Sequence, residues 1–528
     1  MSQDFRLEKG GLINRDKKIS FKFNGKSYFG YEGDTLASAL IANGIHLVGR
    51  SFKYHRPRGF FGAGVDEPYA IVQLYRNNET EPNVRATEQE LFEGLEAKSV
   101  NCWPNVSFDI GAINNFLNKF FPAGFYYKTF MRPRFLWPLF ERVLRRAAGL
   151  GKVDETSRPA PADKQYLHAD VAVIGGGPAG VSAAEAAVAS GCKVILFDEN
   201  DTLGGHLRYS KVDDSGAELR LRIEALSRNQ RVELLLETVV TGLYTDGWVA
   251  AVGRLDSRLY KARATSVVVA TGAHELPGLF DNNDLPGIML GSAAQRLIHL
   301  YGVAPGHRAT VVSANDDGWR VAADLQAAGV DVVAVAEERP ASELGEEAVE
   351  VARHQRGELL YEYAIRAAGG RRQVSAAVLE DASGTYRVIS CDLIVLNTGW
   401  APLLDLAYMA GGHGVYDEVR GEMRLDHAPQ GVFVAGRSAG VHSAREGIED
   451  GRRAGIAAAR HSGFDTGVYA ETSWDSGISP RTSLRIPTPG GGKRFVCFCE
   501  DVTDVDVDTA MSEGYEGIEL LKRYSTIT

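Results

Sequence analysis

A glycine-rich turn between an apolar strand and an alanine-rich helix is the feature that most constrains how this chain can fold. Asp170–Ile174 is a short apolar run, Gly175–Gly180 reads GGGPAG, and the helical pattern that follows stops near Ser190-Gly191. A second apolar run, Lys193–Phe197, comes next. This order of strand, glycine loop, helix and strand predicts a βαβ unit that binds a dinucleotide, and it is much more specific than an isolated G-x-G-x-x-G.

The residues of this loop have distinct expected roles. Gly175 permits the tight turn, Gly177 lets the backbone approach a pyrophosphate, and Gly180 lets helix and strand pack closely. Pro178-Ala179 begin the helix, whose amino end would face the phosphates. Asp198 follows the second strand, where its carboxylate can accept hydrogen bonds from a ribose and would repel the 2′-phosphate of an NADP-type ligand. We therefore expect NAD or FAD on this loop.

Two later strands each end in Thr-Gly. They are Ser266–Ala270, followed by Thr271-Gly272, and Leu393–Leu396, followed by Asn397-Thr398-Gly399. Between them, residues 309–336 follow the pattern of strand, helix and strand, which predicts a second βαβ unit inserted into the first domain. The fold class expected is therefore α/β, with a core of two Rossmann-like dinucleotide-binding domains.

The second βαβ unit lacks the features of a second redox site. Its loop, Ser313–Gly318, has no glycine-rich turn and contains Asp316 and Asp317, whose charges argue by Coulomb repulsion against a pyrophosphate. The C-x4-C pair of disulfide reductases is also missing, because neither Cys192 nor Cys391 has a neighbouring cysteine. A disulfide reductase is therefore excluded.

The chain opens with a pattern typical of a β-grasp, ferredoxin-like domain. Apolar residues alternate over 19–23, Asn24-Gly25 predicts a type I′ hairpin turn, and a helix is expected over 36–41. A plant-type [2Fe-2S] cluster needs cysteines at C-x4-C-x2-C spacing, and the corresponding loop, Gly49–Gly59, has none. We expect the basic and aromatic side chains of this loop to coat a domain interface rather than bind an anionic ligand.

Two segments connect this domain to the glycine loop. Residues 116–150 are rich in aromatic and basic side chains and are interrupted by Pro122, Pro133 and Pro138, which favours an apolar connector packed on another domain or subunit over a membrane-surface helix. Residues 154–163 (DETSRPAPAD) lack large apolar side chains, which predicts an exposed linker.

Charge and cysteine content restrict the partners and the compartment. A formal net charge of -10 offers no broad cationic surface for nucleic acid or an anionic membrane. Five cysteines, of which all but two are isolated, do not resemble a disulfide framework. The first residues lack the apolar core of an export signal, and no apolar stretch is long enough to span a bilayer. We expect a cytoplasmic protein with neither a nucleic-acid nor a membrane partner.

The segment after the second strand resembles the two-dinucleotide-domain flavoprotein and pyridine nucleotide oxidoreductase superfamily. Glu199–Gly205 (ENDTLGG) carries this resemblance, which implies that Glu199, Gly204 and Gly205 lie near the cofactor. It also implies that Thr271-Gly272 close the first half of the site and that a later segment (GVFVAG), ending at Gly436, returns the chain to the cofactor. The superfamily usually continues with the aspartate that holds a flavin ribityl chain. Arg437 stands there instead, and this departure favours NAD over FAD.

Further segments resemble the alpha subunit of heterotetrameric sarcosine oxidase, and the likeness covers essentially the whole chain. They read GYEGDTLASALIANGIHLVGRSFKYHRPRG, PAGFYYKTFM, and VCFCEDVT with ELLKRYST. The resemblance implies the large subunit of a bacterial four-subunit enzyme, which binds NAD without known redox turnover. It implies a smaller partner subunit that holds FAD and oxidises sarcosine, two further small subunits, and an FMN shared between that partner and the large subunit. The FMN passes electrons to oxygen, giving hydrogen peroxide, and the released one-carbon unit can go to tetrahydrofolate.

The end of the chain departs from this family. Its large subunit continues into a folate-binding domain similar to the glycine cleavage T protein, whereas this chain stops at Thr528, so we expect a truncated subunit. Lys522, Arg523 and Thr526 supply cations and a hydroxyl that suit a flavin phosphate and are candidate FMN contacts. The alternative is an ordinary solvated helix end.

Cys497 and Cys499 form a C-x-C motif near the end of the chain. Related amino-acid and opine dehydrogenase subunits use such a motif with a later cysteine pair for a [2Fe-2S] cluster, and no second pair follows here. Two thiolates cannot complete a four-ligand iron–sulfur or zinc site, so no metal site is expected.

The domains expected are a ferredoxin-like domain, a connector, a nucleotide-binding domain in two pieces, an inserted domain, and the beginning of a small helical domain. Their predicted bounds are 1–105, 106–165, 166–275 with 390–465, 276–389, and 466–528. No catalytic residue is identified on this chain, because substrate oxidation is expected on the partner subunit. Two alternatives stay open: a subunit of an FAD-dependent amine, opine or amino-acid dehydrogenase with an iron–sulfur relay, and a non-catalytic NAD-binding scaffold.

Overall fold

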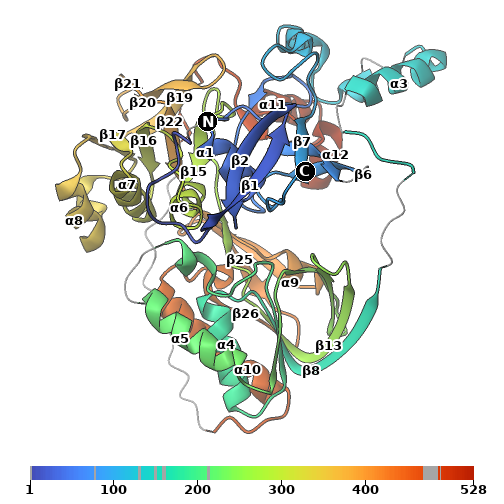
Figure 1. The fold of residues 1–528 in the computed structure, drawn as a ribbon, viewed down its shortest axis with the longest axis vertical. Coiled ribbons are helices and arrows are strands. Elements are labelled where there is room, and N and C mark those ends of the chain that lie inside the picture. Colours follow the sequence, from blue (N-terminus) through green and yellow to red (C-terminus); the bar gives the residue numbers. More distant parts are fainter. Residues whose placement is uncertain are drawn as a thin grey trace. The chain divides into compact units, whose positions relative to one another are not determined.

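The computed structural model describes residues 3–76, 79–128, 132–147, 151–156, 162–210, 215–467, 486–487 and 489–527. The chain divides into two compact units, drawn in Figure 1. Unit 1 comprises Met1–Ser157, Pro277–Thr398 and Leu484–Thr528, and unit 2 comprises Arg158–Leu276 and Gly399–Ser483. The predicted linkers at 154–163 and after 466 lie largely outside the described residues.

Unit 2 is built on a seven-stranded sheet in which the strands next to the glycine loop are parallel. In spatial order the strands are β10 (Val232–Leu235), β9 (Val194–Phe197), β8 (Lys164–Ile174), β13 (Leu259–Val269), β12 (Trp248–Gly253) and β11 (Thr238–Leu243), with β26 (Val432–Val434) paired to β13. Smaller elements of this unit are β14 (Ala273–Glu275), β23 (Trp400–Pro402), α9 (Asp405–Met409), β24 (His413–Asp417) and β25 (Glu422–His427).

Helices α4 (Pro178–Ala189), α5 (Ser215–Ser227) and α10 (Ala444–His461) lie together on one face of this sheet (Figure 1). Alternate residues of β8 separate the two faces: Val171 and Val173 pack with the helices, while Ala172 and Ile174 belong to the core on the other face. The predicted strand, loop, helix and strand are thereby confirmed, and the loop lies at the carboxyl end of β8.

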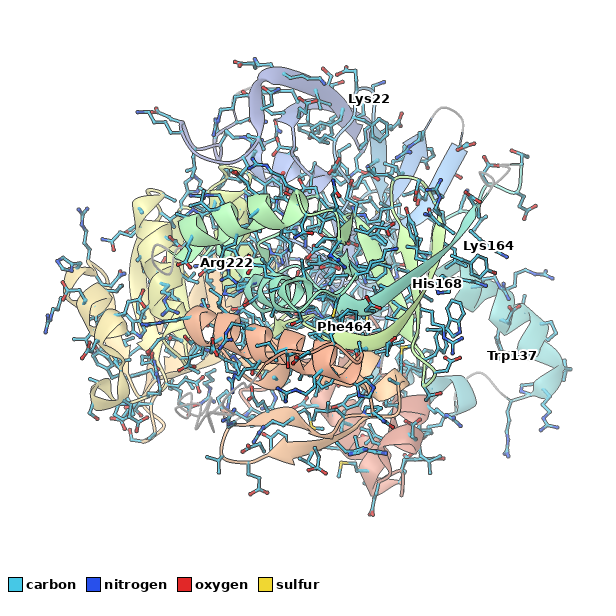
Figure 2. All side chains as sticks on the ribbon, turned by 90° about the horizontal axis from the view of Figure 1, so that it is seen from below. Lys22, Trp137, Lys164, His168, Arg222 and Phe464 are labelled. Carbon is cyan, nitrogen blue, oxygen red and sulfur yellow. The ribbon has the colours of Figure 1, made fainter. Side chains whose placement is uncertain are left out.

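Helices α4 and α10 touch backbone to backbone. A methyl group at Gly451 would overlap the carbonyl oxygen of Ala179, and one at Gly455 would overlap that of Ala183. Arg222 of α5 pairs with Glu185 of α4, and Phe464, which follows α10, packs against the core beneath this helical layer; Figure 2 labels Arg222 and Phe464. The helix that begins at the glycine loop is therefore fixed along its length.

The inserted part of unit 1 is a second parallel α/β layer. Its strands in spatial order are β15 (Ile288–Leu290), β22 (Leu393–Asn397), β16 (Arg308–Ser313), β17 (Asp331–Glu337) and β18 (Glu358–Tyr361), with helices α6 (Gly291–His299), α7 (Asp317–Ala327) and α8 (Glu346–His354). An antiparallel sheet of β19 (Ala364–Gly370), β20 (Val374–Glu380) and β21 (Tyr386–Ser390) accompanies them.

The second βαβ unit forms as predicted, but the predicted return to the first domain at residue 390 differs from the structure. Strand β22 pairs with β15 and β16, so it belongs to the inserted sheet, and the chain re-enters unit 2 at Gly399. The local sequence, a buried strand followed by Thr-Gly, is the same for a strand of either sheet. Only the strands to which β22 is hydrogen-bonded show which sheet it belongs to.

The amino-terminal part of unit 1 is a five-stranded sheet with one helix. Its order is β2 (Lys26–Glu32), β1 (Asn14–Phe23), β7 (Glu96–Ser99), β5 (Ile71–Arg76) and β6 (Glu79–Arg85), and the short strands β3 (Gly49–Arg50) and β4 (Pro57–Arg58) lie apart from it. Asn24 and Gly25 both have positive φ (50° and 76°), as the predicted type I′ turn requires. Helix α1 (Leu36–Ala42) begins at a capping box on Thr35, as expected.

The connector after this domain contains α2 (Phe125–Lys128) and α3 (Trp137–Ala147). Pro138 was expected to break a helix but lies in the first turn of α3, where a missing N–H costs nothing. Phe116 and Phe135 are 82% and 78% exposed, so much of the connector's apolar surface is uncovered by this chain. The carboxyl-terminal segment adds β27 (Phe495–Cys497), β28 (Val502–Thr503), α11 (Asp504–Ser512) and α12 (Ile518–Ser525).

A buried ion network joins the three sequence segments of unit 1. Arg58 is 1% exposed and pairs with Asp284 of the inserted domain and Asp501 of the carboxyl-terminal segment, whose side chains are fully buried. Arg56 grips Asp284 with two further bonds, both 2.7 Å long. Burial opposes ionisation of Asp284, but Arg58 and Arg56 together hold its pKa below the ordinary value. The expectation that the basic, aromatic loop is an interface is therefore confirmed.

We predict that Arg58→Met destabilises the protein by about 3–5 kcal/mol, because it leaves two buried carboxylates without their shared cation. Denaturant unfolding followed by tryptophan fluorescence measures this change. Lys17→Ala removes an exposed partner of Glu32 and should change stability by less than about 0.5 kcal/mol. Equal effects of the two substitutions would contradict a structural role for the network.

Candidate nucleotide-binding site

At two positions of the glycine loop, Gly175 and Gly180, the structure leaves no room for a side chain. Gly175 has φ +100°, and a methyl group there would overlap the carbonyl oxygen of Ala270. A methyl group at Gly180 would overlap the carbonyl oxygen of Gly175, so helix and strand are in direct contact. Gly177 is different: it precedes the first turn of α4 with an ordinary φ of -72°, and a methyl group there would meet nothing closer than Gly205 at 3.9 Å. Its surface is open for a ligand.

A second glycine pair completes this cradle. Gly204 and Gly205 both have positive φ (123° and 54°). The N–H of Gly204 donates to the carbonyl oxygen of Gly176 at 2.8 Å, and a methyl group at Gly205 would lie 2.8 Å from the Cα of Gly177. The structure therefore brings together the two glycine segments that the sequence singled out.

Asp198 is buried and fixes the loop from the end of β9. Its Oδ2 accepts the N–H of Gly176 at 2.6 Å, and its Oδ1 accepts the backbone and side-chain N–H groups of Asn200 at 2.8 and 2.9 Å. A carboxylate has about four acceptor positions, so Oδ2 keeps one for a sugar hydroxyl. The neighbouring Glu199 is partly exposed. Asp198 thus holds the loop in shape as well as offering a ligand contact.

The two later segments of the predicted site meet through a serine that the sequence did not single out. Ser438 Oγ accepts the N–H of Gly272 at 2.7 Å and lies 3.2 Å from the hydroxyl of Thr271. Gly436 has φ +70°, and its N–H donates to Asp450 of α10 at 2.8 Å. Burial raises the pKa of Asp450, although this hydrogen bond favours the ionised form. Short-range patterns gave no signal for these partners because they lie far along the chain.

Arg437 occupies the position where the resembled superfamily has aspartate. Its guanidinium carbon lies 4.3 Å from the centre of the Trp400 ring, a distance suited to a cation–π contact. A cation packed on an indole cannot accept hydrogen bonds from a ribityl chain.

The second loop differs from its sequence-based description. Asp316 pairs with Arg339 at 2.9 Å, and Asp317 pairs with Arg320 at 2.7 Å, so the two carboxylates are not the unscreened charges that the repulsion argument assumed. Arg339 also binds Glu337 at the end of β17, and that carboxylate accepts the indole N–H of Trp319. Side chains of the chain itself therefore occupy the polar positions beside this loop.

The candidate FMN contacts lie at the carboxyl end of α12. Lys522 and Arg523 are exposed in its last turn, where cations are favourable to the helix dipole, and Thr526 follows with φ +66° and its hydroxyl 2.6 Å from the carbonyl oxygen of Ser525. This placement is compatible with a solvated helix end and with a phosphate contact.

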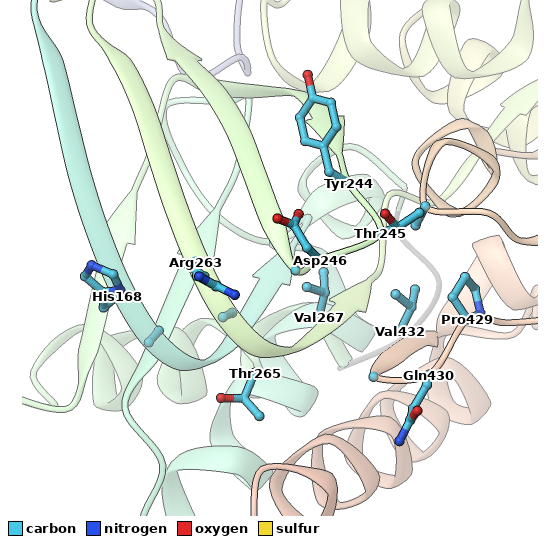
Figure 3. Close-up of a pocket in the computed structure, with 15 residues that line it drawn as sticks. His168, Tyr244, Thr245, Asp246, Arg263, Thr265, Val267, Pro429, Gln430 and Val432 are labelled. Carbon is cyan, nitrogen blue, oxygen red and sulfur yellow. The ribbon is translucent and has the colours of Figure 1, made fainter.

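A cavity of about 530 Å³ in unit 2 lies away from the glycine loop (Figure 3). Its lining includes His168 of β8, Arg263 and Thr265 of β13, Asp246 of the β11–β12 turn, and Gln430 before β26. His168, Arg263 and Thr265 lie before the carboxyl ends of their strands, and none of the predicted cofactor residues lines the cavity. It is therefore separate from the nucleotide site.

Comparison with known proteins identifies the class. Residues 169–459 match the family described as pyridine nucleotide-disulphide oxidoreductase, and the chain belongs to this family. Residues 16–102 match a 2Fe-2S iron-sulfur cluster binding domain, and residues 491–528 match a sarcosine oxidase A3 domain. The predicted fold class and the predicted resemblance are thereby confirmed.

Individual proteins with similar sequences point to a particular group within this family. The chain is 39% identical over 542 residues to the alpha subunit of sarcosine oxidase from Rhizobium meliloti (strain 1021), an alignment that covers 99% of this chain and 54% of the relative. It is 30% identical to the alpha subunit of sarcosine oxidase from Corynebacterium sp. (strain P-1), over 98% of this chain and 52% of the relative. An opine oxidase subunit from Agrobacterium tumefaciens (strain Ach5) is 26% identical over 67% of this chain and 81% of its own length. The chain thus spans about half the length of the sarcosine oxidase subunits that it matches.

A solved structure supports the fold. L-proline dehydrogenase from P. horikoshii superposes with a TM-score of 0.68 at 21% identity, covering 99% of this chain and 90% of that chain. Within the described ranges, we find no helix with the length and apolar character needed to cross a membrane.

The match to a [2Fe-2S] domain does not extend to the cluster ligands. Residues 16–102 contain one cysteine, Cys102, whereas such a cluster needs four protein ligands. Among the residues that the structure describes, no three His, Cys, Asp or Glu side chains gather as metal ligands would. The residues present do not fit this cluster.

Gly177→Ala should weaken nucleotide binding by about tenfold, or ~1.4 kcal/mol, while leaving the melting temperature of the nucleotide-free protein unchanged. The added methyl group points into the open side of the cradle and meets no atom of the protein closely. The measurements are nucleotide content after extraction and a thermal melt of wild-type and variant protein, both stripped of nucleotide.

Gly180→Ala is the matched comparison. Its methyl group would overlap the carbonyl oxygen of Gly175, so this variant should instead lose about 1–3 kcal/mol of stability. Full nucleotide content in the Gly177→Ala protein would rule out a phosphate at this position.

Proposed function

We propose that this chain is the NAD-binding large subunit of a sarcosine oxidase complex. The observation that carries the proposal is the 39% identity, across 99% of the chain, to the alpha subunit of a sarcosine oxidase. The match of residues 491–528 to a sarcosine oxidase A3 domain agrees with this, because the name of that domain carries the same activity. The proposed reaction is the oxidation of sarcosine with water and oxygen to glycine, formaldehyde and hydrogen peroxide, with the one-carbon unit going to tetrahydrofolate where this is available.

The proposed cofactor on this chain is NAD, held by unit 2. Gly175, Gly177 and the amino end of α4 (Pro178, Ala179, Gly180) would bind the pyrophosphate, and Asp198 with Glu199 would bind the adenosine ribose. Gly204, Gly205, Thr271, Gly272 and Gly436 would shape the remaining walls by their close backbone approach. Arg437 on Trp400 supports NAD over FAD, because it replaces the usual ribityl acceptor with a cation.

The chemistry would take place on partner subunits. A smaller subunit would hold FAD and oxidise the amine, and an FMN shared with this chain would pass electrons to oxygen. On this chain Lys522, Arg523 and Thr526 would bind the FMN phosphate. Two further small subunits would complete a heterotetramer, and the proposed compartment is the cytoplasm.

Two other functions have specific discriminators. The similarity to an opine oxidase subunit favours an FAD-dependent dehydrogenase with an iron–sulfur relay, but the C-x-C motif lacks the second cysteine pair within this sequence. A non-catalytic NAD-binding scaffold would leave the FMN content of the complex independent of this chain.

Extraction of the purified protein should release NAD, identified by its mass. The Asp198→Gly protein should discriminate less between NAD and NADP, because the Asp198 carboxylate repels the 2′-phosphate of NADP. Binding of both dinucleotides is measured by titration. FAD as the sole extracted nucleotide would instead support the dehydrogenase.

The doubly substituted protein Lys522→Ala, Arg523→Ala should assemble with its partners yet carry at least about tenfold less FMN, because two phosphate-binding cations are lost. FMN content is read from flavin absorbance after acid extraction, beside sarcosine-dependent oxygen uptake. Lys26→Ala, at the exposed first residue of β2, is the control. If the doubly substituted protein kept both its FMN content and its oxygen uptake, Lys522 and Arg523 would not be FMN ligands.

A further inference from the structure

The C-x-C motif places two thiols side by side at the turn after β27. The Sγ atoms of Cys497 and Cys499 lie 3.2 Å apart. Cys497 is buried at the end of the strand, whereas Cys499 is exposed. One thiol of the pair is therefore accessible to a reagent in solution, and the second lies in contact with it.

Neighbouring contacts hold this turn in place. Phe498, between the two cysteines, is buried with its ring centre 5.0 Å from that of Phe61 and 5.8 Å from that of Tyr69. Asp501, in the same turn, accepts the backbone N–H groups of Lys53 and Tyr54, both at 2.9 Å. Both sides of the motif are therefore anchored to the amino-terminal part of unit 1.

The remaining cysteines are poor competitors for an oxidant. Burial raises the pKa of Cys102 and of Cys192 to about 11, and burial likewise raises the pKa of Cys391. Oxidation by peroxide needs the thiolate, so these three thiols react slowly near neutral pH.

We propose that Cys497 and Cys499 form a reversible thiol–disulfide site that reacts with hydrogen peroxide and is restored by small thiols. The Cys499 thiolate attacks a peroxide oxygen, the O–O bond breaks, and hydroxide leaves as sulfenic acid forms; the proton that the thiol released converts this hydroxide to water. The Cys497 sulfur then displaces hydroxide from that sulfenic acid, which forms the S–S bond and releases a second water. The two cysteines lose two electrons to the peroxide. Two molecules of a small thiol return these electrons by exchange and become a disulfide themselves.

This inference rests on the proposed function only for the source of the oxidant, since the proposed oxidase releases peroxide. The sulfurs need to approach one another by rotation of the exposed Cys499 side chain. The anchored Phe498 and Asp501 can keep their contacts meanwhile, so oxidation is expected to leave unit 1 folded.

The test treats the purified protein, with its accompanying subunits, with one equivalent of added hydrogen peroxide. Free thiols are then alkylated under denaturing conditions, and the peptide holding both cysteines is weighed. The expected result is an unalkylated peptide lighter by two hydrogen atoms, which regains two alkylation sites after dithiothreitol. The same peptide should stay fully alkylated at both sites in untreated, pre-reduced protein.

Two variants make the result decisive. Cys102→Ser should leave disulfide formation unchanged, whereas Cys499→Ser should abolish it and leave Cys497 alkylated after peroxide. Sulfinic acid on Cys499 with Cys497 still free, or a disulfide between two chains on a non-reducing gel, would overturn the proposal. The proposed oxidase function is tested separately by supplying sarcosine and oxygen in place of added peroxide. If the disulfide forms with added peroxide but not during incubation with sarcosine, the thiol–disulfide site is upheld and the result counts against the oxidase function.

Discussion

The shared pairing of one buried arginine with two buried aspartates decides the organisation of unit 1. Arg58 comes from the loop of the ferredoxin-like domain, Asp284 from the start of the inserted domain, and Asp501 from the carboxyl-terminal segment. A buried charge without its partner costs several kcal/mol, so none of the three segments is well accommodated alone. The loop that in cluster-binding relatives would carry cysteines is used here as an interface. The same constraint places the turn containing Cys497 and Cys499 against this loop.

Unit 2 depends on a different principle, the close approach of backbone to backbone. Gly175 and Gly180 bring strand and helix together, and Gly204-Gly205 bring a second loop against Gly177. The result is a cradle lined by main chain, in which the buried carboxylate of Asp198 is fixed by the backbone N–H groups of Gly176 and Asn200. With Arg437 packed on Trp400, this arrangement has the family's nucleotide-binding half without its usual flavin carboxylate. This arrangement is the basis of our proposal that the chain binds a nucleotide while electron transfer occurs on partner subunits.

Structural elements whose signals lie close together in the sequence could be predicted, whereas contacts between distant segments could not. The β1–β2 hairpin, α1 and the first βαβ unit were predicted because their signals lie within a few residues of one another. Strand β22 was assigned to the wrong sheet because a buried strand followed by Thr-Gly reads alike in both. The repulsion assumed at Asp316 overlooked Arg339, which follows a different strand. Ser438 was missed for the same reason, since its partner Gly272 is contributed from a distant segment.

The backbone contact between α4 and α10 has a mechanical consequence. At Gly451 and Gly455 the backbone of α10 lies directly against the carbonyl groups of Ala179 and Ala183, so α4 cannot turn about its axis without displacing α10. Asp450 of α10 also accepts the N–H of Gly436, and a methyl group at Gly436 would overlap the Cβ of Ala179 in the first turn of α4. A nucleotide that holds the amino end of α4 more firmly would therefore also reduce the motion of α10 and of the loop at Gly436. Binding at the glycine loop would make both helices more rigid, and its effect would extend beyond that loop.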